Sequence, residues 1–149
     1  MSESVSPQHD GLLDTDTLIL LAEIESDLPE FPATSAISLA ELTVGPLVAN
    51  TELERSHRLG HLQFAESNFQ ALAFDENAAR VFGRLAAQVR TSGRTARARS
   101  FDLLIASIAV ANDLPLYSVN VDDYVGIDEL DLRAVAHPRH QESSRTICG

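Results

Sequence analysis

Four acidic residues of this chain stand inside or directly against apolar runs, and their positions constrain the fold more than any other feature. A carboxylate near a core is costly unless it is hydrogen-bonded or neutralised, and carboxylates that lie close together repel one another. A bound hard cation would relieve both penalties. The four acids are Asp14 after Gly11–Leu13, Glu41 after Ala36–Ala40, Asp102 between Phe101 and Leu103, and Asp123 soon after Leu116–Asn120.

Short apolar runs alternate with helical segments along the chain. This alternation predicts an α/β fold, a three-layer α/β/α sandwich with a mostly parallel central sheet. We assign the domain to residues 11–136, after a disordered lead-in (1–10) and before a flexible tail (137–149). The expected strands are 11–13, 34–38, 71–74, 114–119 and an edge strand within 131–136; the expected helices are 17–24, one through Glu41 and Leu42, 51–69, one capped by Asp75 that ends near 89, and 101–111.

The acids fall where such a sheet binds its ligands, outside the carboxyl ends of its strands. Asp14 and Asp123 come just after strands, and Glu41 and Asp102 lie in the first turns of helices. If the first, second and fourth strands are neighbours, all four acids reach one edge of the sheet. Clustered carboxylates without His or Cys partners are hard ligands that suit Mg²⁺ or Mn²⁺, and such sites serve phosphoryl chemistry. Taken singly, Asp102 and Asp123 fit a helix-capping role equally well.

Charge gives two opposing signals about nucleic acid. A formal net charge of −11 argues against binding to phosphates, but all eleven basic residues are arginines and several of them cluster between 90 and 99. We expect Arg97 and Arg99, which lie nearest to Asp102 in the sequence, to contact substrate phosphates through bidentate hydrogen bonds. A solvated loop that is favourable beside an acidic surface is the equally supported alternative.

Other features of the chain indicate a cytoplasmic protein without membrane attachment. The 149 residues include one cysteine, Cys148, so no intrachain disulfide can form. No apolar run approaches the roughly 18 residues that a membrane span requires. The first ten residues are polar and lack a signal-peptide core. A reducing cytoplasm is the simplest compartment for such a chain.

The acidic stretches resemble, in order and spacing, the motifs of PIN-domain nucleases. Residues 12–19 resemble the opening strand with the first acid, 37–42 the second motif, 102–106 the third and 118–124 the fourth. The chain length and the residues of the motifs are most similar to those of the VapC toxins of toxin–antitoxin pairs. These toxins are small Mg²⁺-dependent ribonucleases held inactive by a VapB-type antitoxin. The resemblance covers residues 11–136.

The resemblance implies roles for particular residues and partners. Asp14, Glu41, Asp102 and Asp123 would hold the metal, whose bound water would attack an RNA phosphodiester. A VapB-type antitoxin and an RNA substrate are the implied partners. A homodimer is also implied, and the apolar segment 18–24 offers a surface for it.

Several positions near the motifs need separate comment. Asp16 stands where the family usually has asparagine, and Ser118 where threonine is usual. The fourth ligand could be Asp122, Asp123 or the amide of Asn120; Asp123 is preferred because it follows Asn120 by three residues and precedes an aromatic. Ser38 either hydrogen-bonds within the site or caps the helix that follows it.

Three alternatives compete with a metal-dependent nuclease. One is a PIN-fold binding module that lacks catalysis. Another is a haloacid-dehalogenase-like phosphatase, because Asp14-Thr15-Asp16-Thr17 contains the two aspartates that open the D-x-D-x-T signature, whose first aspartate is a nucleophile, but that family needs a later lysine and the chain has none. The third is a zinc site at His57 and His61, spaced i, i+4 after Glu54. The polar helix and the lack of an H-E-x-x-H motif favour surface histidines there.

Overall fold

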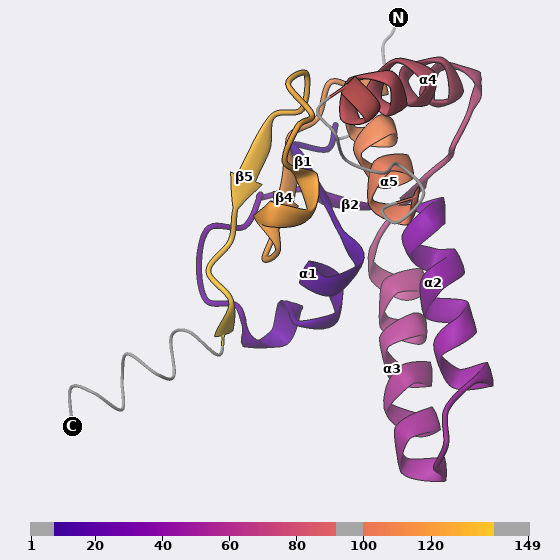
Figure 1. Cartoon of the computed structure of the whole chain (residues 1–149). Coiled ribbons are helices and arrows are strands. Elements are labelled where there is room, and N and C mark those ends of the chain that lie inside the picture. The colour runs from indigo at the N-terminus through magenta and orange to yellow at the C-terminus, as the bar shows by residue number, and fades with distance from the viewer. Residues whose placement is uncertain (1–7, 92–99, 139–149) are drawn as a thin grey trace, which may run out of the picture.

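The computed structural model of the chain describes residues 8–91 and 100–138. Five short strands form one sheet in the order β3-β2-β1-β4-β5, and every neighbouring pair is parallel (Figure 1). Leu12 of β1 is paired with Ala33 of β2 and with Leu116 of β4, so the carboxyl ends of these three strands meet at one edge. The strands are β1 (Gly11–Leu13), β2 (Pro32–Ser35), β3 (Ala71–Leu72), β4 (Leu116–Ser118) and β5 (Leu132–Ala134).

Helices cover both faces of the sheet. They are α1 (Thr15–Ile19), α2 (Ala36–Leu47), α3 (Glu52–Asn68), α4 (Glu76–Thr91) and α5 (Ser100–Ala111), with short 3-10 helices η1 (Leu21–Glu23) and η3 (Val121–Tyr124). Successive strand residues point to opposite faces. Leu12 therefore packs in a core with α4 and α5, while Leu13 packs in a second core with α1, α2 and α3. The predicted α/β sandwich with a parallel sheet is confirmed, and β5 is an edge strand as expected.

Several predicted boundaries differ from the structure, and side-chain caps explain two of them. The third and fourth strands, expected over 71–74 and 114–119, span only Ala71–Leu72 and Leu116–Ser118. The second strand was expected over 34–38 but ends at Ser35, whose hydroxyl accepts a hydrogen bond from Ser38 N and begins α2. The first helix was expected over 17–24 but begins at Thr15, because Asp14 accepts from Thr17 N and caps it. The rest of that segment is the separate 3-10 helix η1. An acid or hydroxyl at the end of a strand, or directly after it, can therefore end the strand and start the helix at once.

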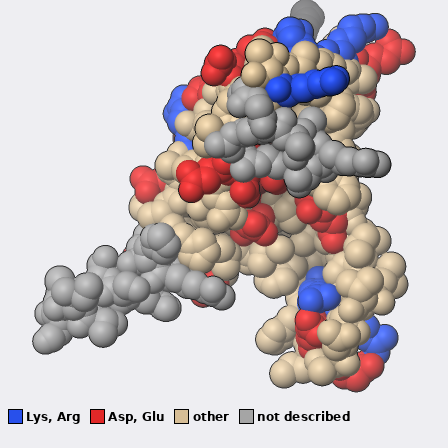
Figure 2. Space-filling model, viewed as in Figure 1, with Lys and Arg blue, Asp and Glu red and all other residues tan. Residues whose placement is uncertain are grey.

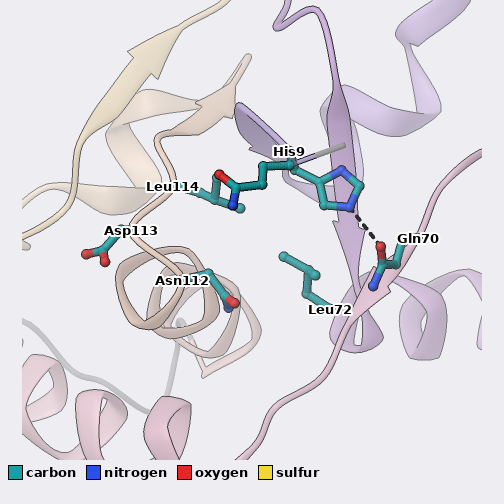
Figure 3. A pocket seen from close by; sticks show the side chains of 7 residues that line it. His9, Gln70, Leu72, Asn112, Asp113 and Leu114 are labelled. Carbon is teal, nitrogen blue, oxygen red and sulfur yellow. Dashed lines mark hydrogen bonds between the residues drawn. The ribbon is translucent and has the colours of Figure 1, made fainter. Parts of the chain in front are cut away.

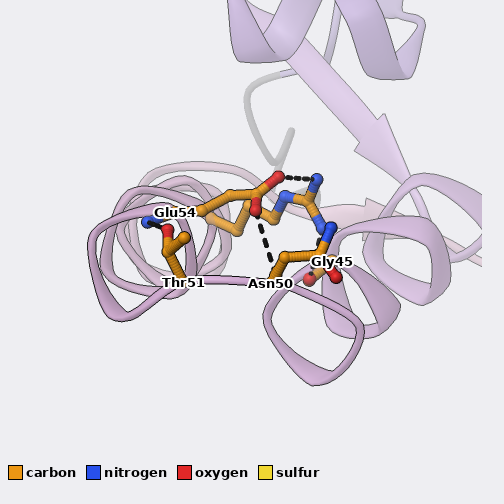
Figure 4. A network of polar contacts seen from close by, with 5 residues as sticks. Gly45, Asn50, Thr51 and Glu54 are labelled. Atoms are coloured by element: carbon orange, nitrogen blue, oxygen red, sulfur yellow. Dashed lines mark hydrogen bonds and ion pairs between the residues drawn. The ribbon is translucent and has the colours of Figure 1, made fainter.

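Helices α2 and α3 lie side by side and extend away from the sheet (Figure 1). Thr51 caps α3 by accepting from Glu54 N, and Glu54 Oε2 accepts from Asn50 N, so the turn between the helices is tied to the start of α3 (Figure 4). Exposed apolar side chains gather near this turn, with Leu47 81% and Leu53 70% exposed.

The apolar segment 18–24, expected as a surface for homodimerisation, is buried only in part. Its two ends, Leu18 and Ile24, are buried, with 3% and 9% of their surface exposed, and Leu18 belongs to the core beneath α2 and α3. Between them, residues 19–21 are partly exposed and residues 22–23 are exposed, so part of the segment remains on the surface. Within the described residues, no helix has the length and apolar character to cross a membrane.

Candidate metal and catalytic site

Asp14 is the most deeply placed acid of the site. It follows β1, caps α1 and is 4% exposed. Its Oδ1 accepts hydrogen bonds from Thr17 N (3.1 Å) and Thr17 Oγ1 (2.5 Å), and its Oδ2 accepts from Ser118 Oγ (2.6 Å) and Tyr124 OH (3.0 Å). A carboxylate offers about four lone-pair positions, so these four bonds satisfy it and fix its orientation. The buried charge is tolerated because it is fully hydrogen-bonded.

Ser118 connects the first and fourth motifs. Its hydroxyl donates to Asp14 and accepts from Asn120 N at 2.9 Å, while Val119 N donates to Thr17 Oγ1 at 3.0 Å. The hydroxyl expected from the sequence at Ser118 thus lies against the first acid. Thr17 and Tyr124 were missed as site residues. Their signals were a hydroxyl three positions after Asp14 and the aromatic next to Asp123.

Glu41 reaches the site from α2 through a short hydroxyl chain. Thr15 Oγ1 donates to Glu41 Oε1 at 2.6 Å and lies 2.8 Å from Ser38 Oγ. Because a hydroxyl has one proton, the Ser38 hydroxyl must donate to Thr15 Oγ1. Of the two roles considered for Ser38, the bond within the site is the observed one, since Ser35 is the helix cap. Thr15 was another residue that the sequence did not single out.

Asp102 lies in the first turn of α5 and is the most perturbed carboxylate. Burial raises its pKa most, and the charges of Asp123, Asp14, Glu41 and Asp16 add to the rise in that order of importance, which brings the pKa to about 6. Burial also raises the pKa of Glu41, with a smaller rise from Asp16 and Asp14 that is opposed by the Thr15 hydrogen bond. Acids from four separate segments are therefore close enough for their charges to disfavour ionisation of Asp102 and Glu41.

The fourth motif places its neighbouring polar residues differently. Asp123 is half-buried in η3, and its charge raises the pKa of both Asp102 and Asp16. Asp122 beside it is exposed. The amide of Asn120 donates from Nδ2 to Asp16 Oδ2 at 2.7 Å. Asp123 is thus the acid of this motif that acts on the cluster, while Asn120 is engaged with Asp16.

Asp16 is a fifth acid of the same cluster. Its pKa is raised first by burial and then by Asp14 and Asp123, whereas His137 and the Asn120 amide lower it. Where the family usually has asparagine, this chain therefore adds a charge that the Asn120 amide partly compensates. Figure 2 shows acidic side chains across the middle of this face, with arginines mostly toward the top and along the lower helical extension.

The donor set fits a hard divalent cation, because it consists of carboxylate and hydroxyl oxygens whose mutual repulsion a positive charge would relieve. In the described part of the chain, no three His, Cys, Asp or Glu side chains converge tightly enough to hold one ion together. Mg²⁺ does not need such a cage, since it keeps several waters and binds through one or two carboxylates. The fit is thus to a partly hydrated ion.

The remaining sequence-based candidates lie elsewhere. Arg97 and Arg99 are outside the described residues. His57 is exposed, and Glu54 of the supposed zinc group instead accepts hydrogen bonds from Asn50 N and Arg58. A separate pocket of about 520 Å³ lies at the amino ends of the strands and is bordered by the His9–Gln70 hydrogen bond (Figure 3). It is at the opposite edge of the sheet from the acids.

Comparison with known proteins identifies the family. No family model matches the chain. It is 36% identical over 122 residues to Ribonuclease VapC5 of Mycobacterium tuberculosis, a match that covers 79% of this chain and 87% of the relative. The chain belongs to the VapC family. The resemblance predicted from the four motifs is thereby confirmed.

Solved structures agree with this assignment. The fold of this VapC-family chain is similar to that in the VapBC-5 toxin–antitoxin structure from M. tuberculosis, with a TM-score of 0.75 and 34% identity over 85% of this chain and 98% of the other. Two less similar structures share the fold. One is VapBC2 from Rickettsia felis bound to a promoter DNA fragment, with a TM-score of 0.65 and 24% identity over 83% of this chain and 97% of the other. The other is FitAcB from Neisseria gonorrhoeae, with a TM-score of 0.68 and 23% identity over 87% of this chain and 99% of the other.

Proposed function

We propose that this VapC-family chain is a Mg²⁺-dependent endoribonuclease, with Mn²⁺ as a substitute, that acts as the toxin of a type II toxin–antitoxin pair in the cytoplasm. The observation that carries the proposal is the cluster of five acids at the carboxyl edge of a parallel sheet, in which burial and neighbouring charges raise the pKa of Asp16, Glu41 and Asp102. The similarity to Ribonuclease VapC5 supports RNA as the substrate.

Asp14, Glu41, Asp102 and Asp123 are the residues that would hold the metal. When bound, the ion would supply positive charge beside the RNA phosphate and lower the pKa of water, so that hydrolysis of the phosphodiester proceeds near neutral pH. Asp14 is the best oriented of the four, because its two oxygens accept hydrogen bonds from β4, α1 and η3; since these bonds use its lone-pair positions, it would exchange one of them for the ion. Donors that fix a ligand's orientation in this way typically contribute to metal affinity.

Tyr124 keeps Asp14 in place at every physiological pH. The phenol is 2% exposed, and burial together with the Asp14 charge raises its pKa above the usual value. It therefore stays protonated and donates to Asp14 Oδ2 throughout. Thr17 supplies two donors and Ser118 one more, so the Asp14 side chain is held in its orientation without help from a cation.

Asp102 behaves differently, because its pKa of about 6 lies close to neutral pH. Without a cation part of its population holds a proton, and a nearby positive charge would release that proton. Cation binding should therefore strengthen as the pH rises through about 6. Glu41, whose pKa is also raised, would contribute in the same direction.

The proposed partners follow from charge. A basic arm of a VapB-type antitoxin could place a cationic side chain among the same carboxylates, which supports inhibition by occupation of the site. RNA is repelled by a chain of net charge −11, so Arg97 and Arg99 are proposed to contact its phosphates near Asp102. A homodimer is proposed from the family alone. Its surface would include the exposed part of segment 18–24.

An RNase assay tests the proposal. The chain should cleave RNA at millimolar Mg²⁺, lose cleavage in EDTA and lose it in Asp14→Asn. Asp131→Asn is the matched control, since it removes an exposed acid that is paired with Arg133 before β5. Cleavage that survives both EDTA and Asp14→Asn would refute the metal mechanism. No cleavage of any RNA would instead support a binding module.

The toxin role has its own test. Expression of the chain alone should arrest growth, and co-expression with the small product of the neighbouring gene should restore it. Growth arrest that persists with that product bound would contradict the antitoxin proposal. Asp14→Asn serves as the control here, because it should abolish toxicity without a partner.

A further inference from the structure

A second cavity lies directly beside the acid cluster. It has a volume of about 220 Å³ and is enclosed by α1, α2 and α3. Asp16 and Glu41 form the part of its wall that belongs to the site already described. Arg58 and His61 of α3 add basic groups, while Ile19 and Leu42 add apolar surface. The metal-dependent function leaves the part contributed by α3 unused.

Arg58 is held in a fixed position at this cavity. Its Nη1 donates to the carbonyl of Gly45 at 2.9 Å, and its Nη2 donates to Glu54 Oε1 at 2.5 Å. Gly45 allows the close approach, since a Cβ there would lie 3.3 Å from Arg58 Cδ. Glu54 is itself fixed by Asn50 N and by its position in the capped first turn of α3 (Figure 4).

This geometry leaves Arg58 able to recognise a ligand. A guanidinium has five N–H donors in a rigid plane, and the two bonds to Gly45 and Glu54 take two of them. Because both bonds are made within the protein, little side-chain entropy remains to be lost when a ligand binds.

The mixture of groups selects the chemistry of the occupant. A phosphate would be repelled by Asp16 and Glu41, and a cationic side chain would be repelled by Arg58. A neutral planar group that has donors on one edge, acceptors on another and apolar faces can contact the carboxylates, the guanidinium and the apolar side chains favourably. A nucleobase is such a group, and unpaired RNA bases are typically recognised by hydrogen bonds to their edges and by stacking. The volume is below the roughly 300 Å³ at which pockets for drug-sized ligands begin, which suits one base.

Among the bases, guanine matches best. Its O6 and N7 are adjacent acceptors that pair with arginine, and its N1–H and N2 amino group are adjacent donors that suit a carboxylate. Adenine and cytosine each present one amino group without the adjacent ring N–H, and uracil has no amino group.

We propose that this cavity receives one unpaired base of the RNA next to the cleaved phosphodiester, with guanine preferred, and that Arg58 and His61 are specificity-determining residues. The inference rests on the proposed ribonuclease function for its biological meaning. The pocket itself can be tested without cleavage, because an uncharged nucleoside is a sufficient probe.

The binding test is an NMR titration of the metal-free protein with guanosine, adenosine, cytidine and uridine. Guanosine should bind about tenfold or more tightly than the others, the discrimination expected of one bidentate pair. Arg58→Gln should remove the preference. Ile19→Trp, which fills the cavity and leaves the Arg58 bonds in place, should abolish binding. Arg55→Gln is the matched control on the same helix, since Arg55 is exposed and paired with Glu52 outside the cavity.

The cleavage test uses a pool of single-stranded RNAs with randomised sequence. Wild type and Arg55→Gln should cleave next to guanine, and Arg58→Gln and Ile19→Trp should lose that preference. Equal binding of all four nucleosides, or unchanged guanine preference in both pocket variants, would overturn the inference while leaving the nuclease function intact. Selective guanosine binding without any RNA cleavage would uphold the pocket and reject the nuclease function.

Discussion

Asp102→Asn should stabilise the metal-free protein at neutral pH, although it removes a residue of the proposed metal site. The pKa of Asp102 is raised from 3.8 to about 6, first by burial and then by four neighbouring acids. A carboxyl whose pKa is raised by folding contributes stability below its unfolded pKa and loses it as the pH rises through the folded value. The window is therefore pH 3.8 to 6, and the penalty is complete above it.

The magnitude follows from the shift. A rise of 2.2 pKa units, from 3.8 to about 6, corresponds to about 3 kcal/mol at 1.36 kcal/mol per unit. Asp102 is only about half buried, so solvent screening reduces this to about 1–2 kcal/mol. For a chain of this size that gain equals a rise in Tm of about 3–8 °C. At pH 5 roughly half of the gain should remain, because part of the penalty develops between pH 5 and 6.

The assay is urea and thermal unfolding in EDTA at pH 5.0, 6.0 and 7.5. Asp113→Asn is the control, because Asp113 is exposed, lies at the opposite edge of the sheet and has a positive φ of 55° that asparagine also tolerates. Adding Mg²⁺ should then stabilise the wild type more than Asp102→Asn. A gain that does not grow between pH 5.0 and 7.5, or a variant less stable than the wild type at pH 7.5, would refute the assigned crowding of acids.

Three further substitutions test the hydrogen bonds and charges around these acids. Tyr124→Phe removes one of the four donors to Asp14 and should cost about 1.5–3 kcal/mol in urea unfolding; an unchanged midpoint would show that the phenol contributes nothing. Ser118→Ala should weaken Mg²⁺ binding severalfold in calorimetry while Ser118→Thr retains it, because only the second keeps the donor to Asp14; equal losses in both would point to packing instead. Asp16→Asn should lower the pKa of Asp102 in carbon-detected NMR titration, since it removes one of the four charges that raise it; a pKa that stays the same or rises would exclude that coupling.

Much of the fold was predictable because apolar runs and helix caps are local signals. The run 11–13 and the cap at Asp75 appear in the structure as read from the sequence. The end of the second strand was not predictable in the same way, since Ser35 and Ser38 are both good caps and the sequence does not tell which one is used. The choice depends on Thr15, which comes from another segment and engages Ser38.

The candidate site was likewise predictable only where its signals are local in the sequence. The acids at strand ends were predictable from the sequence, because a carboxylate beside apolar residues is unusual. The hydroxyl groups that hydrogen-bond to these acids were not predictable. Nothing in the sequence around Thr15, Thr17 and Tyr124 shows that the fold brings them against Glu41 and Asp14. Pairing over 104 and 110 residues of sequence, as from Ser118 and Tyr124 to Asp14, leaves no local pattern.

The contrast between Asp14 and the other acids supports the proposal that one site accepts either a metal ion or a basic protein group. Asp14 is satisfied by four donors from the chain itself, so its charge needs no external partner. Asp16, Glu41 and Asp102 retain raised pKa values even with the hydrogen bonds of Asn120 and Thr15 in place. The unrelieved repulsion lies in these three acids, and any cation placed among them would relieve it. Metal and antitoxin should therefore compete for the same carboxylates, and a metal titration of the toxin–antitoxin complex should show weaker Mg²⁺ binding than the free toxin. Equal affinity in both forms would mean that the antitoxin inhibits from elsewhere on the surface.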